Sequence, residues 1–211
     1  MKKILLLLFI ALTFSSLSQA QTNYFVFGVK SMRVSSDNPD VSKNKSSLGL
    51  DLGFGKNFKN KHWAADLTVF NELLTHRYYV FQDHYHEGSI LSTGLALSPY
   101  YCINPAGDFQ FSFSMALKVG HNFSIGDVSS KNIPPAGFQP SGAFSESLAP
   151  CFSVNCPLES TSIGVDLGYN TANLSTGLNK FRSGYYRSFN YNPGYVFVGL
   201  FVRLNAQKIK A

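Results

Sequence analysis

Apolar and polar side chains alternate along residues 109–120. Three phenylalanines, a methionine, a leucine and a valine occupy the odd positions, and small or polar residues occupy the even ones. A period of two is that of a β-strand, whose successive side chains point to opposite faces, and not that of a helix. The pattern predicts a strand with one strongly apolar face, and we expect lipid to cover that face.

The same alternation recurs along the chain and predicts eight strands. The segment around Pro150 shows it least clearly, because proline cannot donate a hydrogen bond to a neighbouring strand. Most segments are close to the roughly 9–11 residues that a tilted strand needs to cross a bilayer. The predicted strands span residues 24–33, 47–56, 62–71, 89–102, 109–120, 148–156, 161–170 and 195–205.

The connections between these strands alternate in length. Three are short, at residues 57–61, 103–107 and 157–160, and four are long, at residues 34–46, 72–88, 121–147 and 171–194. Outer-membrane barrels combine short periplasmic turns with long extracellular loops in this way. We therefore predict an all-β fold, an eight-stranded antiparallel up-and-down transmembrane barrel.

The N-terminus has the features of a secretory signal peptide. Two lysines follow Met1, an apolar run extends from Ile4 to Phe14, and Ser18-Gln19-Ala20 provides a small-x-small cleavage site. The apolar run is shorter than the roughly 20 residues of a transmembrane helix, which disfavours a membrane anchor. We expect a signal peptide at residues 1–20, cleaved near Ala20, and a barrel domain at residues 21–211.

Composition suits a membrane barrel better than a nucleic-acid-binding protein. Aromatic residues make up 15% of the chain and charged residues only 14%. Loss of Lys2 and Lys3 with the signal peptide lowers the formal net charge from +6 to +4. The remaining basic residues are scattered and form no stripe, so we predict no nucleic-acid partner.

Together, the signal peptide, the eight alternating segments and the loop pattern resemble the small outer-membrane β-barrel families. These include the transmembrane domain of outer-membrane protein A, outer-membrane protein X and the PorT-type barrel domain. Residues 199–204 are similar to the C-terminal insertion signal of such proteins, although Val198 replaces the usual polar residue and the chain continues past the strand. The resemblance implies a cell outer membrane location, contact with its lipids and lipopolysaccharide, and insertion by the barrel-assembly machinery.

Six charged residues share the polar parity, which faces the barrel interior. A basic side chain facing hydrocarbon would cost about 2–4 kcal/mol at the bilayer midplane. An eight-stranded barrel has an interior about wide enough for its own side chains. We interpret the set as a charge-balanced polar plug; an ion-selective pore or catalytic carboxylates are the alternatives. The set comprises Lys30, Asp51, Asp66, Lys118, Asp166 and Arg203.

Three loop features have the composition of functional sites. His84 and His86 carry metal-binding imidazoles, but we favour a solvated loop and predict no metal or cofactor. His121 and Ser124 invite comparison with lipid A deacylases, whose His-x-Ser pair lies on one strand face; here two residues intervene, so we predict no catalytic residue. An aromatic and basic cluster could form a binding site for sugars, lipopolysaccharide phosphates or a protein partner. Its rings could equally belong to the aromatic girdle at the outer interface, the interpretation that we favour. That cluster contains Lys180, Phe181, Arg182, Tyr185, Tyr186 and Arg187.

These patterns predict a non-enzymatic outer-membrane barrel protein that is structural, adhesive or accessory to envelope assembly or secretion. A lipid-modifying outer-membrane enzyme is one alternative. A secreted lipocalin-like barrel is another, but it would have to pack the phenylalanines of residues 109–120 inside and turn Asp51 and Lys118 outward. We assign no disulfide among Cys102, Cys151 and Cys156.

Overall fold

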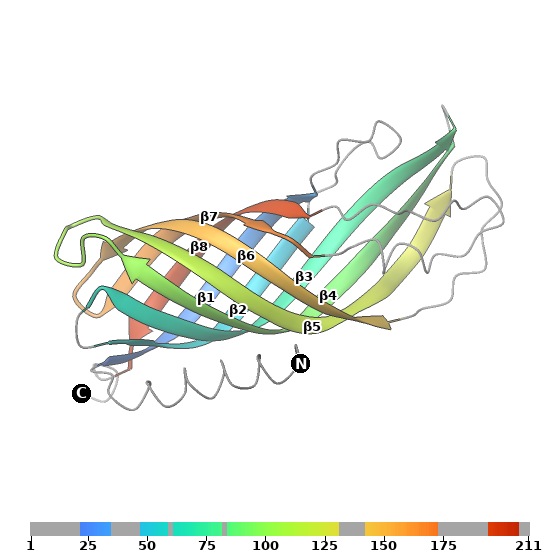
Figure 1. The fold of residues 1–211 in the computed structure, drawn as a ribbon. Coiled ribbons are helices and arrows are strands. Elements are labelled where there is room, and N and C mark those ends of the chain that lie inside the picture. Colours follow the sequence, from blue (N-terminus) through green and yellow to red (C-terminus); the bar gives the residue numbers. More distant parts are fainter. Residues whose placement is uncertain are drawn as a thin grey trace.

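A computed structural model describes residues 22–34, 47–58, 61–81, 84–130, 142–172 and 194–206. Eight strands account for nearly all of these residues. The predicted all-β barrel is confirmed (Figure 1). No helix within the described ranges has the length and apolar character needed to cross a membrane. The strands are β1 (Thr22–Val34), β2 (Ser47–Asn57), β3 (Trp63–Phe81), β4 (His84–Cys102), β5 (Gln110–Ser130), β6 (Gly142–Pro157), β7 (Thr161–Asn170) and β8 (Tyr195–Asn205).

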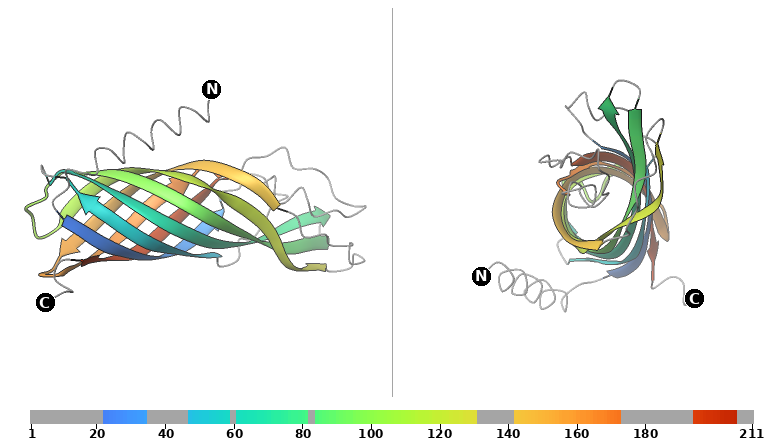
Figure 2. Two further views of the ribbon diagram at one scale, coloured as in Figure 1. Left: turned by 90° about the horizontal axis from the view of Figure 1, so that it is seen from below. Right: turned by 90° about the vertical axis from the view of Figure 1, so that its right-hand side faces the viewer.

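The sheet closes on itself. Every strand pairs antiparallel with its neighbours in sequence, and β1 also pairs antiparallel with β8. The view along the barrel axis in Figure 2 shows the resulting ring. Closure pairs the main-chain groups of the first and last strands, so the ring itself has no open edge.

The two faces of the wall follow the predicted alternation. Phe111 is 39% exposed, whereas the next residue, Ser112, is 4% exposed. Leu50 and Asp51 differ in the same way, with 47% and 9% of their surfaces exposed. Apolar side chains therefore point outward and polar side chains inward, which is the reverse of a lipocalin-like barrel.

The sequence prediction was wrong about two of the four long loops, because strands occupy most of the residues assigned to them. Residues 72–88 mostly continue β3 and β4, which run in register from Leu74 opposite Ile90 to Tyr78 opposite His86 and are joined through residues 82–83. Likewise β5 extends to Ser130 and β6 begins at Gly142, which shortens the 121–147 connection to residues 131–141. Strand pairing uses main-chain hydrogen bonds, so a hairpin can continue where the apolar alternation fades. Figure 1 shows β3, β4 and β5 projecting beyond the other strands at one end.

Pro150 is accommodated inside β6. Its side chain is exposed, and it lies opposite Met115 of β5. The ladder between β6 and β7 starts only at the next residue, Cys151. The proline therefore lies where β6 has just left its β7 partner, so its missing N–H donor costs no rung of that ladder.

Short turns gather at the opposite end from the projecting hairpin. They connect β2 to β3, β4 to β5 and β6 to β7, and the start of β1 and the end of β8 lie at the same end. In the first turn, Lys61 takes a positive φ of 56°, and its N–H donates to the carbonyl of Phe58 at 3.0 Å. We call this the short-turn end; the other is the long-loop end.

Candidate functional site

Near the long-loop end, one buried carboxylate joins three strands. Glu72 of β3 accepts hydrogen bonds from the Lys118 ammonium of β5 and from the Tyr195 hydroxyl of β8. The Tyr195 hydroxyl in turn accepts from Asn170 and, at 3.2 Å, from Lys118. The Lys118 ammonium also lies 4.0 Å from the ring centre of Phe70, a favourable cation–π distance. These bonds span the lumen and hold the three strands together from inside.

Midway along the barrel, polar partners come from adjacent strands. Lys30 of β1 forms an ion pair with Asp51 of β2. The Ser153 hydroxyl of β6 donates to the carboxylate of Asp166 on β7 at 2.6 Å. Asp166 therefore has a neutral partner, whereas Asp51 has a cationic one.

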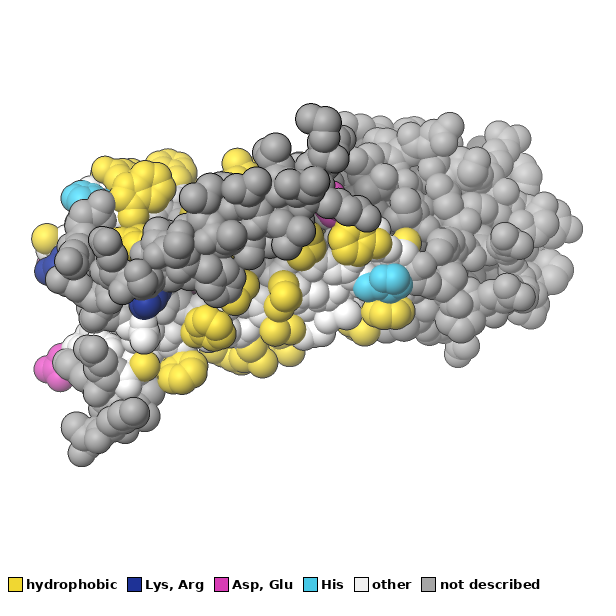
Figure 3. All heavy atoms as spheres, turned by 60° about the horizontal axis from the view of Figure 1, so that its bottom comes forward, with side chains coloured by type: hydrophobic (Ala, Val, Ile, Leu, Met, Phe, Trp, Pro, Cys, Tyr) yellow, Lys and Arg dark blue, Asp and Glu magenta, His cyan; other side chains and the backbone are white. Residues whose placement is uncertain are grey.

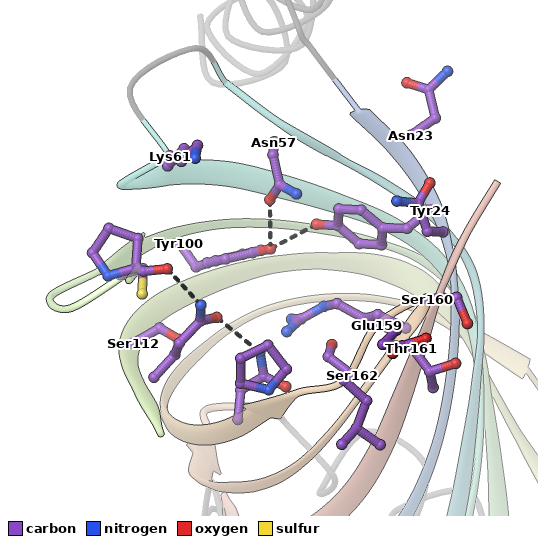
Figure 4. Close-up of a pocket in the computed structure, with 18 of the residues that line it drawn as sticks. Asn23, Tyr24, Asn57, Lys61, Tyr100, Ser112, Glu159, Ser160, Thr161 and Ser162 are labelled. Carbon is purple, nitrogen blue, oxygen red and sulfur yellow. Dashed lines mark hydrogen bonds between the residues drawn. The ribbon is translucent and has the colours of Figure 1, made fainter. Parts of the chain in front are cut away.

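At the short-turn end, an arginine and two tyrosines converge on a second carboxylate. Arg203 Nη2 donates to Asp66 Oδ2 at 3.0 Å, and the Tyr24 hydroxyl donates to Asp66 Oδ1 at 2.6 Å. The hydroxyls of Tyr24 and Tyr100 are 2.7 Å apart, and the Arg203 guanidinium lies 4.7 Å from the Tyr100 ring centre. Figure 4 shows the two tyrosine hydroxyls pointing toward each other, with Asn57 beyond Tyr100. Since the proton of Tyr24 goes to Asp66, the Tyr24 oxygen is an acceptor for Tyr100, whose hydroxyl also lies 3.5 Å from Asn57 Oδ1.

All six charged residues assigned from sequence to the interior face inward, and the structure pairs them selectively. Lys30 pairs with Asp51, and Arg203 pairs with Asp66. The partner of Lys118 is Glu72, which the sequence prediction had placed in a loop. With Glu72 included, the described interior set holds three cations and four carboxylates, not three of each. Each cation has a carboxylate partner.

Two cavities interrupt this packing. A central cavity of about 70 Å³ lies among the side chains of Lys30, Asp51, Asp66 and Arg203. A larger cavity of about 310 Å³ opens at the short-turn end, and Tyr24, Tyr100 and Arg203 form part of its lining. The central cavity has room for only a few water molecules, each of which occupies about 30 Å³ in the liquid.

The three cysteine thiols are free. Cys102 is buried near the end of β4, and Cys151 and Cys156 are half-buried in β6. The Cys151 sulfur lies 3.9 Å from the Ser153 hydroxyl and 3.6 Å from the Phe152 carbonyl oxygen.

Several candidate loop sites lie partly or wholly outside the described residues. These are the aromatic and basic cluster of residues 180–187 and the side chains of His84, His86 and Ser124. The predicted signal peptide at residues 1–20 also lies outside them. His121 is described; it lies on the outward parity of β5, and its ring centre is 4.6 Å from that of Phe123. Among the described residues, no group of three His, Cys, Asp or Glu side chains is arranged to hold a metal ion.

Comparison with known proteins gives structural matches only. No protein-family model matches the chain, and a search of curated proteins finds no match. The crystal structure of Neisserial surface protein A superposes with a TM-score of 0.55 at 12% identity, covering 88% of this chain and 97% of that one. This chain has the fold of a small outer-membrane β-barrel.

Two further outer-membrane barrel structures align more loosely. The attachment invasion locus protein Ail of Yersinia pestis gives a TM-score of 0.47 at 15% identity, covering 88% of this chain and 99% of that one. The outer membrane protein OprG of Pseudomonas aeruginosa gives 0.42 at 13% identity, covering 89% and 94%. The likeness in fold rests on the first match alone.

Sequence reasoning missed the neutral partners that complete the interior. Tyr24, Tyr100 and Tyr195 lie on the polar parity, where their rings could have been taken for packing residues. Glu72 had a usable signal, because it continues the inward parity of Asp66 within the same strand. Extending the predicted strand at residues 62–71 by one residue would have placed Glu72 in the lumen.

Proposed function

We propose that this chain is a non-enzymatic integral barrel protein of the cell outer membrane, with a structural or adhesive role or one accessory to envelope assembly or secretion. The observation that carries the proposal is the apolar outer wall around an interior closed by ion pairs. Apolar side chains on every strand are strongly exposed, among them Phe54 at 57%, Phe113 at 55% and Leu200 at 63%. Figure 3 shows such side chains spread along one face of the described wall.

A water-soluble location does not fit this wall. Contiguous apolar patches on soluble monomers rarely exceed a few hundred Å². Here the exposed apolar residues occur in all eight strands and encircle the barrel. Outer-membrane lipid is the partner that this surface fits best.

The interior supports a role other than conduction of solutes. Lys118, Glu72 and Tyr195 bond across the lumen from three different strands. A second set, formed by Tyr24, Asp66 and Arg203, crosses it near the short-turn end. Both sets must break before a wide path opens, and breaking a buried ion pair is costly.

The orientation and partners follow from the barrel geometry. The short turns would face the periplasm and the long connections the cell exterior. The cluster at residues 180–187, with its arginines and tyrosines, is the candidate surface for lipopolysaccharide or a protein partner. Residues 199–204 of β8 would be the segment engaged by the barrel-assembly machinery, after removal of residues 1–20.

Cell fractionation and electrophoresis test the location. The protein should appear in the outer-membrane fraction and migrate differently on a gel before and after boiling. The mass of the mature protein should match a chain whose first residue lies near Gln21. Recovery from the soluble periplasmic fraction without detergent would refute the membrane assignment.

Reconstitution and lipid analysis test the role. Purified protein in planar bilayers should give no large, stable conductance steps, because the lumen is crossed by bonded side chains. Mass spectrometry of lipid A from cells with and without the protein should show the same acylation pattern. A change in acylation would favour the enzyme alternative.

A further inference from the structure

An oblique row of four aromatic rings crosses the outer wall from the short-turn end. Trp63 of β3 lies opposite Tyr101 of β4, and Tyr101 lies opposite Phe113 of β5. Phe113 in turn lies opposite Phe152 of β6. The ring centres are 5.1 Å apart in the first pair and again in the last. Trp63 begins β3, whereas Phe152 lies well inside β6, so the row rises from the rim into the wall.

The rim end of this row carries positive charge. Lys56 shares the outward parity of β2, and the residue opposite it on β3 lies two residues after Trp63. Lys56 and Trp63 are therefore diagonal neighbours, about 7–8 Å apart, a separation that long side chains can bridge. Lys61 is exposed in the turn that leads into β3. Figure 3 shows basic and histidine side chains beside hydrophobic ones at this end of the barrel.

The other two short turns differ in charge. Exposed carboxylates occur in the turn between β4 and β5, at Asp108, and in the turn between β6 and β7, at Glu159. Among the described residues of the short turns, outward positive charge is therefore concentrated where the ring row begins.

His62 fixes the first rings of the row. Its ring stacks on Tyr101, with the centres 5.5 Å apart and the planes 17° from parallel. Its Nδ1 donates to the carbonyl of Cys102 at 2.8 Å, and the Cys102 N–H donates to the His62 carbonyl at 2.6 Å. Tyr101 therefore contacts His62 and the edge of Trp63. Because these rings are already held, they lose little conformational freedom when a ligand packs on them.

An anionic phospholipid fits both parts of this surface. Its acyl chain is apolar and matches the rings, and its negatively charged head group matches the lysines. A lysine ammonium has three donors, so Lys56 can bond a phosphate oxygen in addition to its contact within the chain. A water-soluble anion would leave the rings uncovered, and a zwitterionic lipid would bring a second cation toward Lys61. We propose that this part of the wall binds one anionic phospholipid, with its phosphate at Lys56 and a chain along Trp63, Tyr101 and Phe113.

The lipid site rests on the proposed membrane location, to which it adds a lipid class and a place on the wall. With the short turns facing the periplasm, the lipid belongs to the periplasmic leaflet of the outer membrane. The two proposals fail in different ways. A wall that meets acyl chains without preferring an anionic head group would refute only the lipid site.

Trp63 lies inside the proposed site and is the only tryptophan of the chain, so its fluorescence reports which lipid lies beside it. The mature protein is refolded into vesicles that mix phosphatidylglycerol with phosphatidylcholine, one of which carries bromine on its chains close to the head group. Measuring quenching over a range of mole fractions, and then exchanging which lipid is brominated, gives the ratio of the two binding constants. The ratio should favour phosphatidylglycerol about fivefold, the effect of one lysine at an anionic membrane surface.

Two variants and a control locate the cation. Lys56→Gln keeps much of the side-chain length but removes the charge, and it should lose most of this preference. Lys56→Arg keeps the charge and should retain the preference. Arg33→Gln is the matched control, because Arg33 is an exposed cation near the opposite end of β1, beyond reach of the site.

Three outcomes would overturn the proposal. The first is equal quenching of the unchanged protein by the two brominated lipids. The second is a preference that Lys56→Gln leaves unchanged or that Lys56→Arg loses to the same extent. The third is an equal loss in Arg33→Gln, which would mean that only the total charge of the protein matters. Heat-modifiable migration establishes that each variant is folded, and absence of quenching by either lipid would refute the membrane location as well.

Discussion

Glu72 of β3 and Lys118 of β5 form an ion pair inside the barrel, with β4 between their strands. Their side chains are 2% and 5% exposed. Tyr195 of β8 bonds to both, so the pair is tied to a third strand on the other side of the lumen. A polar link of this kind is stable only while every member is satisfied, because each would otherwise be a buried polar group without a partner.

Replacing Glu72 should therefore destabilise the barrel strongly. Glu72→Gln keeps the shape but leaves the Lys118 charge buried without a counterion, and losing one member of a buried pair costs about 3–5 kcal/mol. We expect a loss near the lower end, because the amide oxygen can still accept one hydrogen bond. Urea titration of the protein in lipid vesicles measures the change in the free energy of unfolding.

Glu146 supplies the control for this experiment. It is an exposed glutamate in β6, and Glu146→Gln should change the free energy of unfolding by less than about 0.5 kcal/mol, as at other surface sites. If Glu72→Gln and Glu146→Gln change the free energy of unfolding equally, the bonds from Glu72 to Lys118 and Tyr195 do not stabilise the barrel more than a surface residue does.

Two phenylalanines of β8 lie over glycines of β7, and this contact gives a second prediction. A Cβ atom at Gly164 would lie 2.2 Å from the Phe201 ring and 2.7 Å from the Val154 carbonyl oxygen. Gly164→Ala should therefore cost about 1–3 kcal/mol, as overpacking does elsewhere. Adding Phe201→Leu should recover part of the loss, since it removes the ring but leaves the backbone contact.

The matched control is Gly28→Ala. A Cβ there would meet its nearest neighbour, Asp51 Cβ, at 3.5 Å, an ordinary contact. The same vesicle unfolding assay should show little change for this variant. A Gly164→Ala loss that Phe201→Leu does not reduce would mean that the ring is not the obstacle.

The sequence alone predicted the strands wherever lipid and lumen impose opposite demands on neighbouring residues. Leu50 and Asp51 illustrate this: one must be apolar and the other polar, so the period of two is visible. Beyond Glu72 the hairpin of β3 and β4 leaves this regime: the inward residues Leu74 and Ile90 are apolar and buried, so the apolar and polar alternation stops while the main-chain ladder continues. The ladder has no side-chain signature of its own, and so residues 72–88 resembled a loop.

The sequence did not predict which side chains bond to one another inside the lumen. Parity places Lys118 and Asp166 on the inner face, but which residues meet depends on strand stagger and on position along the axis. Lys118 meets Glu72 across β4, whereas Asp166 accepts a hydrogen bond from the directly paired Ser153.

A charge placed on the outer wall should disrupt membrane insertion in proportion to its depth. Leu200 is 63% exposed and pairs with Val29 and Val165, in the middle of the apolar wall. Leu200→Arg should cost about 2–4 kcal/mol there. Leu158→Arg, in the turn between β6 and β7, should cost at most about 1 kcal/mol. Refolding into vesicles, followed by gel migration, measures both, and similar losses at the two sites would contradict the proposed position of the membrane.

The single tryptophan of the chain reports depth without any substitution. Trp63 is 48% exposed at the start of β3, and its ring centre lies 5.1 Å from that of Tyr101 on β4. Aromatic residues at the ends of membrane strands sit at the level of the lipid head groups. Lipids brominated near the head group should therefore quench Trp63 fluorescence more than lipids brominated near the chain ends.

Moving the tryptophan to the middle of the wall should reverse that order. In the double variant Trp63→Phe and Leu200→Trp, the new indole replaces an outward side chain far from both barrel ends, so bromines near the chain ends should quench best. The two proteins differ only at these positions, which makes the comparison independent of lipid composition. If no brominated lipid quenches the fluorescence of either protein, the apolar wall does not face acyl chains, and the proposed membrane location is refuted.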